Sequence, residues 1–254
     1  MRVRLATYNI HKCVGGVDRR YDPQRVRDAL APYKPDVVLL QEAAVLAAPF
    51  RDRQAELLAA LLDLPHVAFA PNVTLRAGGQ YGNAVLSRFA LSDVVNVDLT
   101  FPPKKRRSAL FARCRLRREG AGGGRSRSLM VCSLHLGLAG LERRLQVRRL
   151  LECGPLRRLH ARTPLAVGGD FNDFWGTLGP RLFAPAGFRG LGRFRPTFPA
   201  WAPLRALDSL YVRGDVSLVV THVPRSLASR RASDHLPVIA DLEIAPPRRR
   251  APRV

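Results

Sequence analysis

The sequence predicts a single α/β domain in which short buried strands alternate with amphipathic helices. Its 254 residues are 46% apolar and 24% charged, the composition of a globular chain with a substantial core. No internal repeat and no linker interrupts the pattern. We therefore expect one domain over residues 1–245, followed by a basic, proline-containing tail at 246–254 that is disordered.

Short apolar runs bounded by polar or turn residues predict the strands. The expected strands are 3–10, 37–40, 67–70, 81–87, 91–99, 109–118, 129–134, 165–167, 207–212, 216–223 and 238–244. The run 37–40 is apolar throughout, which indicates a strand buried on both faces. In 109–118, mostly apolar residues alternate mostly with arginines, so we expect a half-buried antiparallel strand with a basic outer face, followed by a flexible hairpin turn at 120–124.

Three amphipathic helices are expected between these strands. Asp22 caps the first, and Pro23 is its first helical residue. The second covers 51–62, and the third covers 141–160 with a break or kink at Gly154-Pro155. The expected apolar stripes are Val26, Leu30 and Tyr33 in the first helix and Leu141, Leu145 and Leu151 in the third.

The net charge is +22 and the pI is near 11.4, which is unusually basic for a globular domain. Only four of the 42 basic residues are lysines, and the other 38 are arginines. Such a surplus attracts polyanions, whether nucleic acid, anionic lipid or phosphorylated small molecules. A bias toward arginine codons explains it equally well, so the charge supports an anionic substrate without choosing one.

The four cysteines show neither metal-ligand spacing nor a CxxC pair, and reduced thiols are expected. Residues 1–9 contain no continuous apolar segment that would make a signal peptide. No apolar run approaches the length that crosses a membrane. A cytoplasmic, monomeric protein without a transmembrane segment is therefore expected.

The stretch Gly168-Gly169-Asp170-Phe171-Asn172-Asp173 follows the buried run 165–167 and is the strongest chemical signal in the chain. On extended backbone, Asp170 and Asn172 point the same way. The carboxylate could orient or deprotonate a water while the carboxamide donates to an oxyanion, as hydrolysis of a phosphoester requires. Taken alone, the stretch could equally be a turn in which these side chains bond to nearby backbone.

Polar residues recur at the ends of otherwise apolar strands. They are Asn9, Glu42, Asn83, His135, Asp170, Asn172, Asp208, Asp234 and His235. Each alone has a structural explanation, such as a hydrogen-bonded core histidine or a turn cap. Nine together are hard to attribute to packing, because burying unpaired polar groups is unfavourable. They indicate a site for a hard metal ion with carboxylate ligands and amide and imidazole partners.

Seven stretches carry a resemblance to a known family. They are Thr7-Tyr8-Asn9-Ile10-His11, Gln41-Glu42, Gly82-Asn83-Ala84-Val85-Leu86-Ser87-Arg88, Ser133-Leu134-His135-Leu136, Gly169-Asp170-Phe171-Asn172, Leu207-Asp208 and Ser233-Asp234-His235. In this order the sequence resembles the endonuclease/exonuclease/phosphatase superfamily, which includes deoxyribonucleases and apurinic-site endonucleases. The resemblance implies a four-layer α/β/β/α sandwich, with two packed mixed β-sheets flanked by helices and the active site at one end.

The resemblance also implies a metal site. Glu42, supported by Asn9, is the expected main ligand of Mg²⁺, with Mn²⁺ as a substitute, and Asp234 could join a second metal site. One or two metal ions are both compatible with this set of residues.

The same resemblance implies catalytic roles. Asp170 would orient or deprotonate the attacking water, and Asn172 would hold a phosphoryl oxygen. His235, paired with Asp208, would be a general base or a charged phosphate donor, so Asp170 and His235 are alternatives for the base. His135 would stabilise the pentacovalent transition state. The reaction class is in-line attack of water on phosphorus with Mg²⁺ neutralising the oxyanion.

For the substrate, the leading hypothesis is a nucleic-acid phosphodiester. The run Lys104-Lys105-Arg106-Arg107 supports it, with Lys104, Arg106 and Arg107 as expected phosphate contacts. Asn83 is a further candidate for substrate binding, where some deoxyribonuclease relatives carry a carboxylate. The alternatives are a phospholipid headgroup, a soluble phosphate ester, or a non-catalytic nucleic-acid-binding module. No damaged-DNA wedge is recognisable, and Cys13 stands where relatives tend to have glycine.

Overall fold

The computed structural model describes residues 1–47, 51–76, 78–116, 127–190 and 195–246. The expected hairpin turn at 120–124 and all but the first residue of the expected tail lie outside these ranges. The four cysteines are free, as expected, and Cys13, Cys114 and Cys132 are buried. Among the helices in the described ranges, none has both the length and the apolar character needed to cross a membrane.

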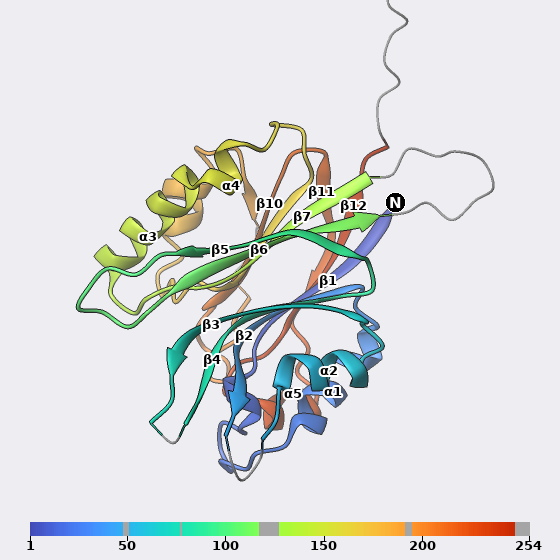
Figure 1. Ribbon diagram of the computed structural model, residues 1–254, viewed down its shortest axis with the longest axis vertical. Coiled ribbons are helices and arrows are strands. Elements are labelled where there is room, and N and C mark those ends of the chain that lie inside the picture. The colour runs from blue at the N-terminus through green and yellow to red at the C-terminus, as the bar shows by residue number, and fades with distance from the viewer. Residues whose placement is uncertain (48–50, 77, 117–126, 191–194, 247–254) are drawn as a thin grey trace, which may run out of the picture.

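Two six-stranded sheets form the middle of the molecule (Figure 1). The first has the order β11 (Val216–His222), β12 (Val238–Ile244), β1 (Arg2–Asn9), β2 (Val37–Leu46), β4 (Gly79–Ser87) and β3 (His66–Thr74). The second has the order β5 (Leu91–Asp98), β6 (Ser108–Leu116), β7 (Arg127–His135), β8 (Leu165–Asp170), β10 (Asp208–Arg213) and β9 (Arg189–Gly190). Each sheet is mixed, because β1–β2 and β7–β8 are parallel pairs and the other pairings are antiparallel.

Helices cover the outer face of each sheet (Figure 1). The first sheet packs against α1 (Pro23–Leu30), α2 (Gln54–Leu61) and α5 (Leu227–Ala232), and the second against α3 (Gly140–Glu152) and α4 (Gly154–Arg157). Short turns of other helix types are η1 (His11–Cys13), η2 (Ala31–Tyr33) and η3 (Gly179–Phe183). Three apolar layers result, one between the sheets and one under each set of helices. The predicted four-layer sandwich is confirmed.

The local signals at helix ends are mostly confirmed. The Asp22 side chain accepts a hydrogen bond from the Gln24 backbone and caps α1, with Pro23 at its first position. The expected third helix is divided at Cys153, directly before Gly154-Pro155. The sequence analysis missed α5, a single short helix that Ser226 caps through the Ser229 backbone.

Two expectations about exposed faces are wrong. The expected stripe of the third helix contains Leu141, which is 68% exposed, whereas Val147 and Leu150 are buried under the second sheet. The expected exposed face of β6 is wrong at Phe111, which is buried in the same apolar layer, whereas Arg113 and Arg115 of that face do reach solvent. In the first case α3 turns Val147 and Leu150 toward the second sheet, and in the second the helix layer covers Phe111 of β6, so the buried face depends on which element packs there.

Gly168 of β8 lies where the two sheets approach each other closely. A Cβ there would lie 2.9 Å from Cδ1 of both Leu210 and Leu39 and 3.3 Å from Cβ of Thr7. We expect Gly168→Ala to lower the free energy of unfolding by about 1–3 kcal/mol, because the extra methyl overfills a packed layer. Urea denaturation measures this loss. Gly154→Ala is the matched control, since a Cβ there meets no atom within 4 Å, and an equal loss in both variants would contradict the packing argument.

Candidate active site

The two parallel strand pairs deliver their carboxyl ends to one edge of the sandwich. Asn9 at the end of β1 pairs with Gln41 of β2, and His135 at the end of β7 pairs with Asp170 of β8. Asp208 begins the antiparallel strand β10 directly opposite Asp170. Since these strands come from both sheets, the packing of one sheet on the other brings their polar ends together.

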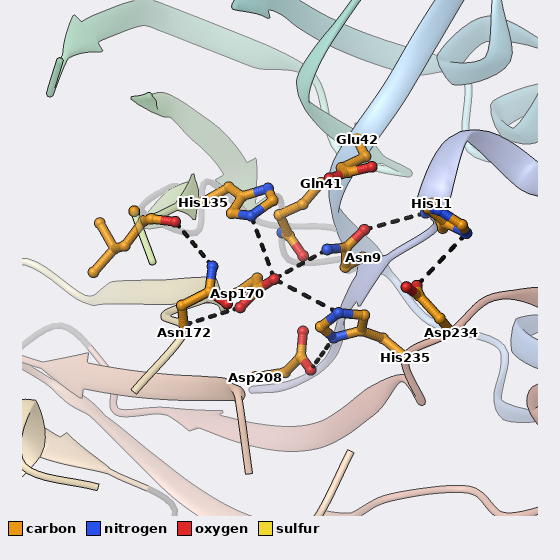
Figure 2. Close-up of polar contacts among 12 residues, drawn as sticks. Asn9, His11, Gln41, Glu42, His135, Asp170, Asn172, Asp208, Asp234 and His235 are labelled. Carbon is orange, nitrogen blue, oxygen red and sulfur yellow. Dashed lines mark hydrogen bonds and ion pairs between the residues drawn. The ribbon is translucent and has the colours of Figure 1, made fainter. Parts of the chain in front are cut away.

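Asp170 lies at the centre of the resulting cluster (Figure 2) and is only 2% exposed. Its Oδ2 accepts a hydrogen bond from Asn9 Nδ2 at 3.0 Å and lies 3.4 Å from Nε2 of His135 and 3.8 Å from Nε2 of His235. Its Oδ1 accepts from the Asn172 backbone N–H at 2.9 Å. Four chain segments far apart in sequence therefore converge on one buried carboxylate.

His235 forms a buried pair with Asp208, whose Oδ2 lies 2.8 Å from Nδ1 of the imidazole. Burial by itself would lower the pKa of His235, but the charges of Asp208 and Asp170 outweigh it and raise this pKa to about 10. At neutral pH the His235 ring is therefore an imidazolium with both N–H groups available to donate. Its Nε2–H points toward Asp170 and the cleft (Figure 2).

The two histidines beside Asp170 differ in charge. Burial raises the pKa of the Asp170 carboxyl to about 6, with the charge of His235 acting in the opposite direction. Burial also lowers the pKa of His135 well below its usual range, and the charge of Arg107 adds to this effect. Above about pH 6 the cluster thus contains an ionised Asp170, a charged His235 and a neutral His135.

Glu42 reaches the same cleft from a bulge in β2 between Leu40 and Ala43, where its own φ is +56°. Its Oε2 forms an ion pair with Nζ of Lys12 in the turn η1. Burial would raise the pKa of Glu42, but the charges that His135 and Lys12 can carry outweigh it and lower this pKa to about 2. Because His135 is neutral at pH 7, Lys12 is the cation that balances Glu42 there.

The residues around Glu42 fit a hard divalent metal ion. The oxygen donors at this end of the cleft are Glu42, Asn9, Asp234 and Asp170, which is the ligand chemistry that Mg²⁺ prefers. The Lys12 ammonium pairs with Glu42 and would have to share this carboxylate with a metal ion. A second group, Asp170, Asp208 and His235, brings its ligand atoms within 4.8 Å of one another. In that group Asp208 is paired with His235 at 2.8 Å and does not line the cleft, whereas Glu42 does, so Glu42 is the better candidate ligand.

An open cleft of about 830 Å³ joins these groups. Of the nine predicted strand-end residues, seven line it, namely Asn9, Glu42, His135, Asp170, Asn172, Asp234 and His235. Asp208 lies behind His235, and Asn83 is buried with its Nδ2 donating to the Ser108 backbone at 2.8 Å. Asn172 donates through Nδ2 to the Leu136 backbone at 2.9 Å, so its side chain ties β8 to the segment after β7 (Figure 2).

The basic loop before β6 differs from the prediction. Lys105 and Arg107 line the cleft, whereas Lys104 and Arg106, both named as phosphate contacts, do not. Neighbouring residues of an extended loop point in opposite directions, so the choice depends on a register that the sequence does not reveal. The second acid of the central motif, Asp173, accepts from the Leu178 backbone N–H at 2.6 Å and supports the following loop instead of the cleft.

Several cleft residues were missed in the sequence analysis. They are His11, Lys105, Arg143, Arg144 and Trp175, which line the cleft, and Lys12, which is not part of the lining but pairs with the lining residue Glu42. His11 lies 3.7 Å from Oδ1 of Asp234 and bonds through its backbone N–H to Asn9 Oδ1, so it links two predicted metal ligands (Figure 2). Their position in the sequence could have identified His11 and Lys12, since both follow closely after the end of the first strand.

Comparison with known proteins decides the family. Residues 6–235 match the Endonuclease/Exonuclease/phosphatase family. The chain belongs to this family. The protein YbhP of Escherichia coli K12 is 30% identical over 258 residues, covering 95% of this chain and 96% of YbhP.

Solved structures of the family share the fold. An endonuclease/exonuclease/phosphatase from Beutenbergia cavernae is 25% identical, with a TM-score of 0.75 over 96% of this chain and 72% of that chain. The catalytic domain of human nocturnin, solved with a bound sulfate anion, is 20% identical, with a TM-score of 0.73 over 96% of this chain and 94% of that chain. Members of the superfamily are metal-dependent phosphoesterases, and this chain is accordingly a phosphoesterase whose carboxylates and histidines suit a divalent metal.

Proposed function

We propose that the protein is a Mg²⁺-dependent phosphodiesterase that cleaves nucleic acid by attack of an activated water. Glu42, Asn9 and Asp234 would hold the metal, consistent with their oxygen donors at one end of the cleft. When bound, Mg²⁺ would neutralise negative charge on the phosphate and stabilise the developing oxyanion.

Asp170 is the general base in this proposal. Its carboxylate lines the cleft, and Asn9, His135 and His235 surround the Oδ2 atom, so its orientation is fixed before a substrate arrives. A base whose pKa lies below neutral is ionised at working pH and can accept the proton of a water. His235 is already protonated at that pH, so it cannot take this proton and instead donates to the phosphate.

The other groups stabilise the transition state. The imidazolium of His235, kept charged by Asp208, carries a positive charge where the phosphorane oxygens gain negative charge. His135, neutral and also beside Asp170, donates a hydrogen bond to another phosphoryl oxygen. Both donors lie on rigid strand ends or their adjoining loop, so little reorganisation is needed during the reaction.

The basic wall of the cleft supports nucleic acid as the substrate. Lys105, Arg107, Arg143 and Arg144 line it, and the two exposed ones, Lys105 and Arg144, can contact backbone phosphates on either side of the scissile bond. The chain's net charge of +22 adds a general attraction for a polyanion. A small monoester would make no use of four cations along an open cleft.

Neutralising cleft cations tests this substrate. We expect the double variant Lys105→Gln, Arg144→Gln to bind single-stranded DNA more weakly and to reduce the slope of log K against log salt by about 1–2. Fluorescence anisotropy at several salt concentrations measures that slope. The matched control is Lys104→Gln, Arg106→Gln, which removes the same charge from exposed residues outside the cleft lining. Equal slopes in the two double variants would contradict the proposed path of the strand.

A phospholipid headgroup is the second candidate, and one observation favours it. Large apolar side chains that are 61–76% exposed occur in three segments near the cleft, at Leu138, Leu141, Trp175, Trp201 and Leu204. Leu138 and Trp175 line the cleft itself, and Ala200, next to Trp201, donates to the Asp234 backbone at 2.7 Å. Exposed Leu and Trp beside cations are typical of surfaces that meet a lipid interface.

A substrate panel separates the candidates. Supercoiled plasmid, single-stranded DNA, anionic phospholipid vesicles and a chromogenic bis-aryl phosphodiester are incubated with Mg²⁺ or with EDTA. Metal-dependent DNA cleavage that Asp170→Asn abolishes is the expected result. Hydrolysis of the vesicle lipid or the small diester without DNA cleavage would overturn the nucleic-acid assignment while leaving the phosphodiesterase chemistry in place.

A further inference from the structure

Lys12, in the turn η1, lies beside Glu42, the carboxylate proposed as a metal ligand. Its Nζ forms an ion pair with Oε2 of Glu42. We propose that Lys12 is an internal counter-ion of Glu42, which a divalent metal must displace and which is then released to the substrate phosphate. This inference rests on the proposed function in one respect, namely that Glu42 holds the metal.

The backbone holds the two residues against each other. Lys12 and Glu42 both have left-handed φ angles, +58° and +56°, which non-glycine residues adopt only when surrounding contacts hold them. The buried side chain of Gln54 supplies such contacts. It donates to the Lys12 carbonyl at 2.8 Å and accepts from the Ala44 backbone N–H at 2.8 Å, two residues beyond Glu42. One amide therefore fixes the Lys12 turn to the strand that carries Glu42.

Ammonium and metal compete for the same oxygen. A divalent ion ligated by Glu42 Oε2 would lie within a few ångströms of the Lys12 charge, and repulsion in a partly buried site is strong. The ammonium must therefore leave the carboxylate when the metal binds, and metal affinity is lower than the oxygen donors alone would provide.

The displaced side chain has a place to go. Lys12 Nζ already lies 5.1 Å from the ring centroid of Tyr81, and Lys105 Nζ lies 5.1 Å from the centroid of the same ring. Such cation–π contacts keep an ammonium near the ring without binding its protons to an anion. Freed from Glu42, Lys12 would join Lys105 as a phosphate-binding pair beside the metal. Metal binding would thereby free the Lys12 ammonium to bind the substrate phosphate.

The test is the affinity for Mg²⁺ in the absence of substrate, measured by isothermal titration calorimetry. We expect Lys12→Met to bind Mg²⁺ about tenfold or more tightly than the wild type, because the competing ammonium is gone. Lys105→Met is the matched control, since it removes an ammonium at the same distance from Tyr81 that does not pair with Glu42. We expect its affinity to change by about threefold at most. Equal changes in both variants would overturn the inference.

Two further measurements keep the outcome interpretable. In EDTA, Lys12→Met should melt at a lower temperature than wild type because Glu42 loses its partner, and Mg²⁺ should raise its melting temperature more. Lys12→Arg, which retains the charge, should show no gain in affinity. Lys12→Gln, which removes the charge but keeps a polar side chain, should show the gain and decides the question if Lys12→Met does not fold. Glu42→Gln separates the two proposals. If it leaves Mg²⁺ affinity unchanged, the metal site itself is misplaced. If it weakens binding while Lys12→Met and Lys105→Met behave alike, only the role of Lys12 fails.

Discussion

Asp170→Asn is expected to lower kcat by about 10³-fold or more while leaving the fold intact, because it removes the proposed general base, which would accept the proton of the attacking water. The new amide has nearly the same shape, so circular dichroism should be unchanged. Asp173→Asn is the matched control, since this second buried acid of the same motif accepts from the Leu178 backbone and does not line the cleft. Its kcat should stay within a few-fold of wild type. Comparable losses in both variants would show that the motif is structural.

The pH dependence follows from the same carboxyl. Because the pKa of Asp170 is raised to about 6, its base form is absent below that pH, and kcat/KM should rise as the pH increases through 6. The pKa of His235 is raised to about 10, so kcat/KM should fall as the imidazolium loses its proton near that pH. A plateau between the two is the expected profile. A fall between pH 6 and 8 would contradict a charged His235.

His235→Ala is expected to lower kcat by about 10²- to 10³-fold, the usual effect of removing a donor aimed at the developing oxyanion. The variant should also lose the alkaline fall in the pH profile, and the rise that Asp170 sets should move to higher pH, because the imidazolium that lowers the pKa of Asp170 is gone. His222→Ala, which removes a histidine of β11 that does not line the cleft, is the control and should leave kcat unchanged.

The His235 result also bears on the choice of base. If His235→Ala abolished the acid limb of the profile instead of the alkaline one, His235 would be the base and Asp170 the positioning group. The structure argues against that exchange, since Asp208 Oδ2 lies 2.8 Å from Nδ1 of His235 and stabilises the protonated ring. Asp208→Asn should therefore shift the alkaline limb to lower pH, because it weakens the hold on that proton.

Much of the fold followed from local patterns. Buried strands such as 37–40 and 165–167, the Asp22 cap and the break before Gly154 depend on residues that are neighbours in the chain. The buried and exposed faces of the helices and strands were harder to predict than the helices and strands themselves. Leu141 is exposed where burial was expected, and Phe111 is buried where exposure was expected. Which face is covered depends on a helix or sheet from elsewhere in the chain.

Local patterns in the sequence predict the strand ends, the polar residues at them and the family to which their order belongs. Which of these side chains meet depends on how the two sheets pack. The packing of the two sheets brings Asp170 within 3.0 Å of Asn9 and 3.8 Å of His235, and Asp173, three residues from Asp170, is turned away. The tertiary structure likewise places Lys105, and not Lys104, at the cleft, and it pairs Lys12 with Glu42. Side-chain direction reverses with each residue of an extended segment, and charge states depend on burial and on partners distant in sequence, so neither is contained in a local pattern.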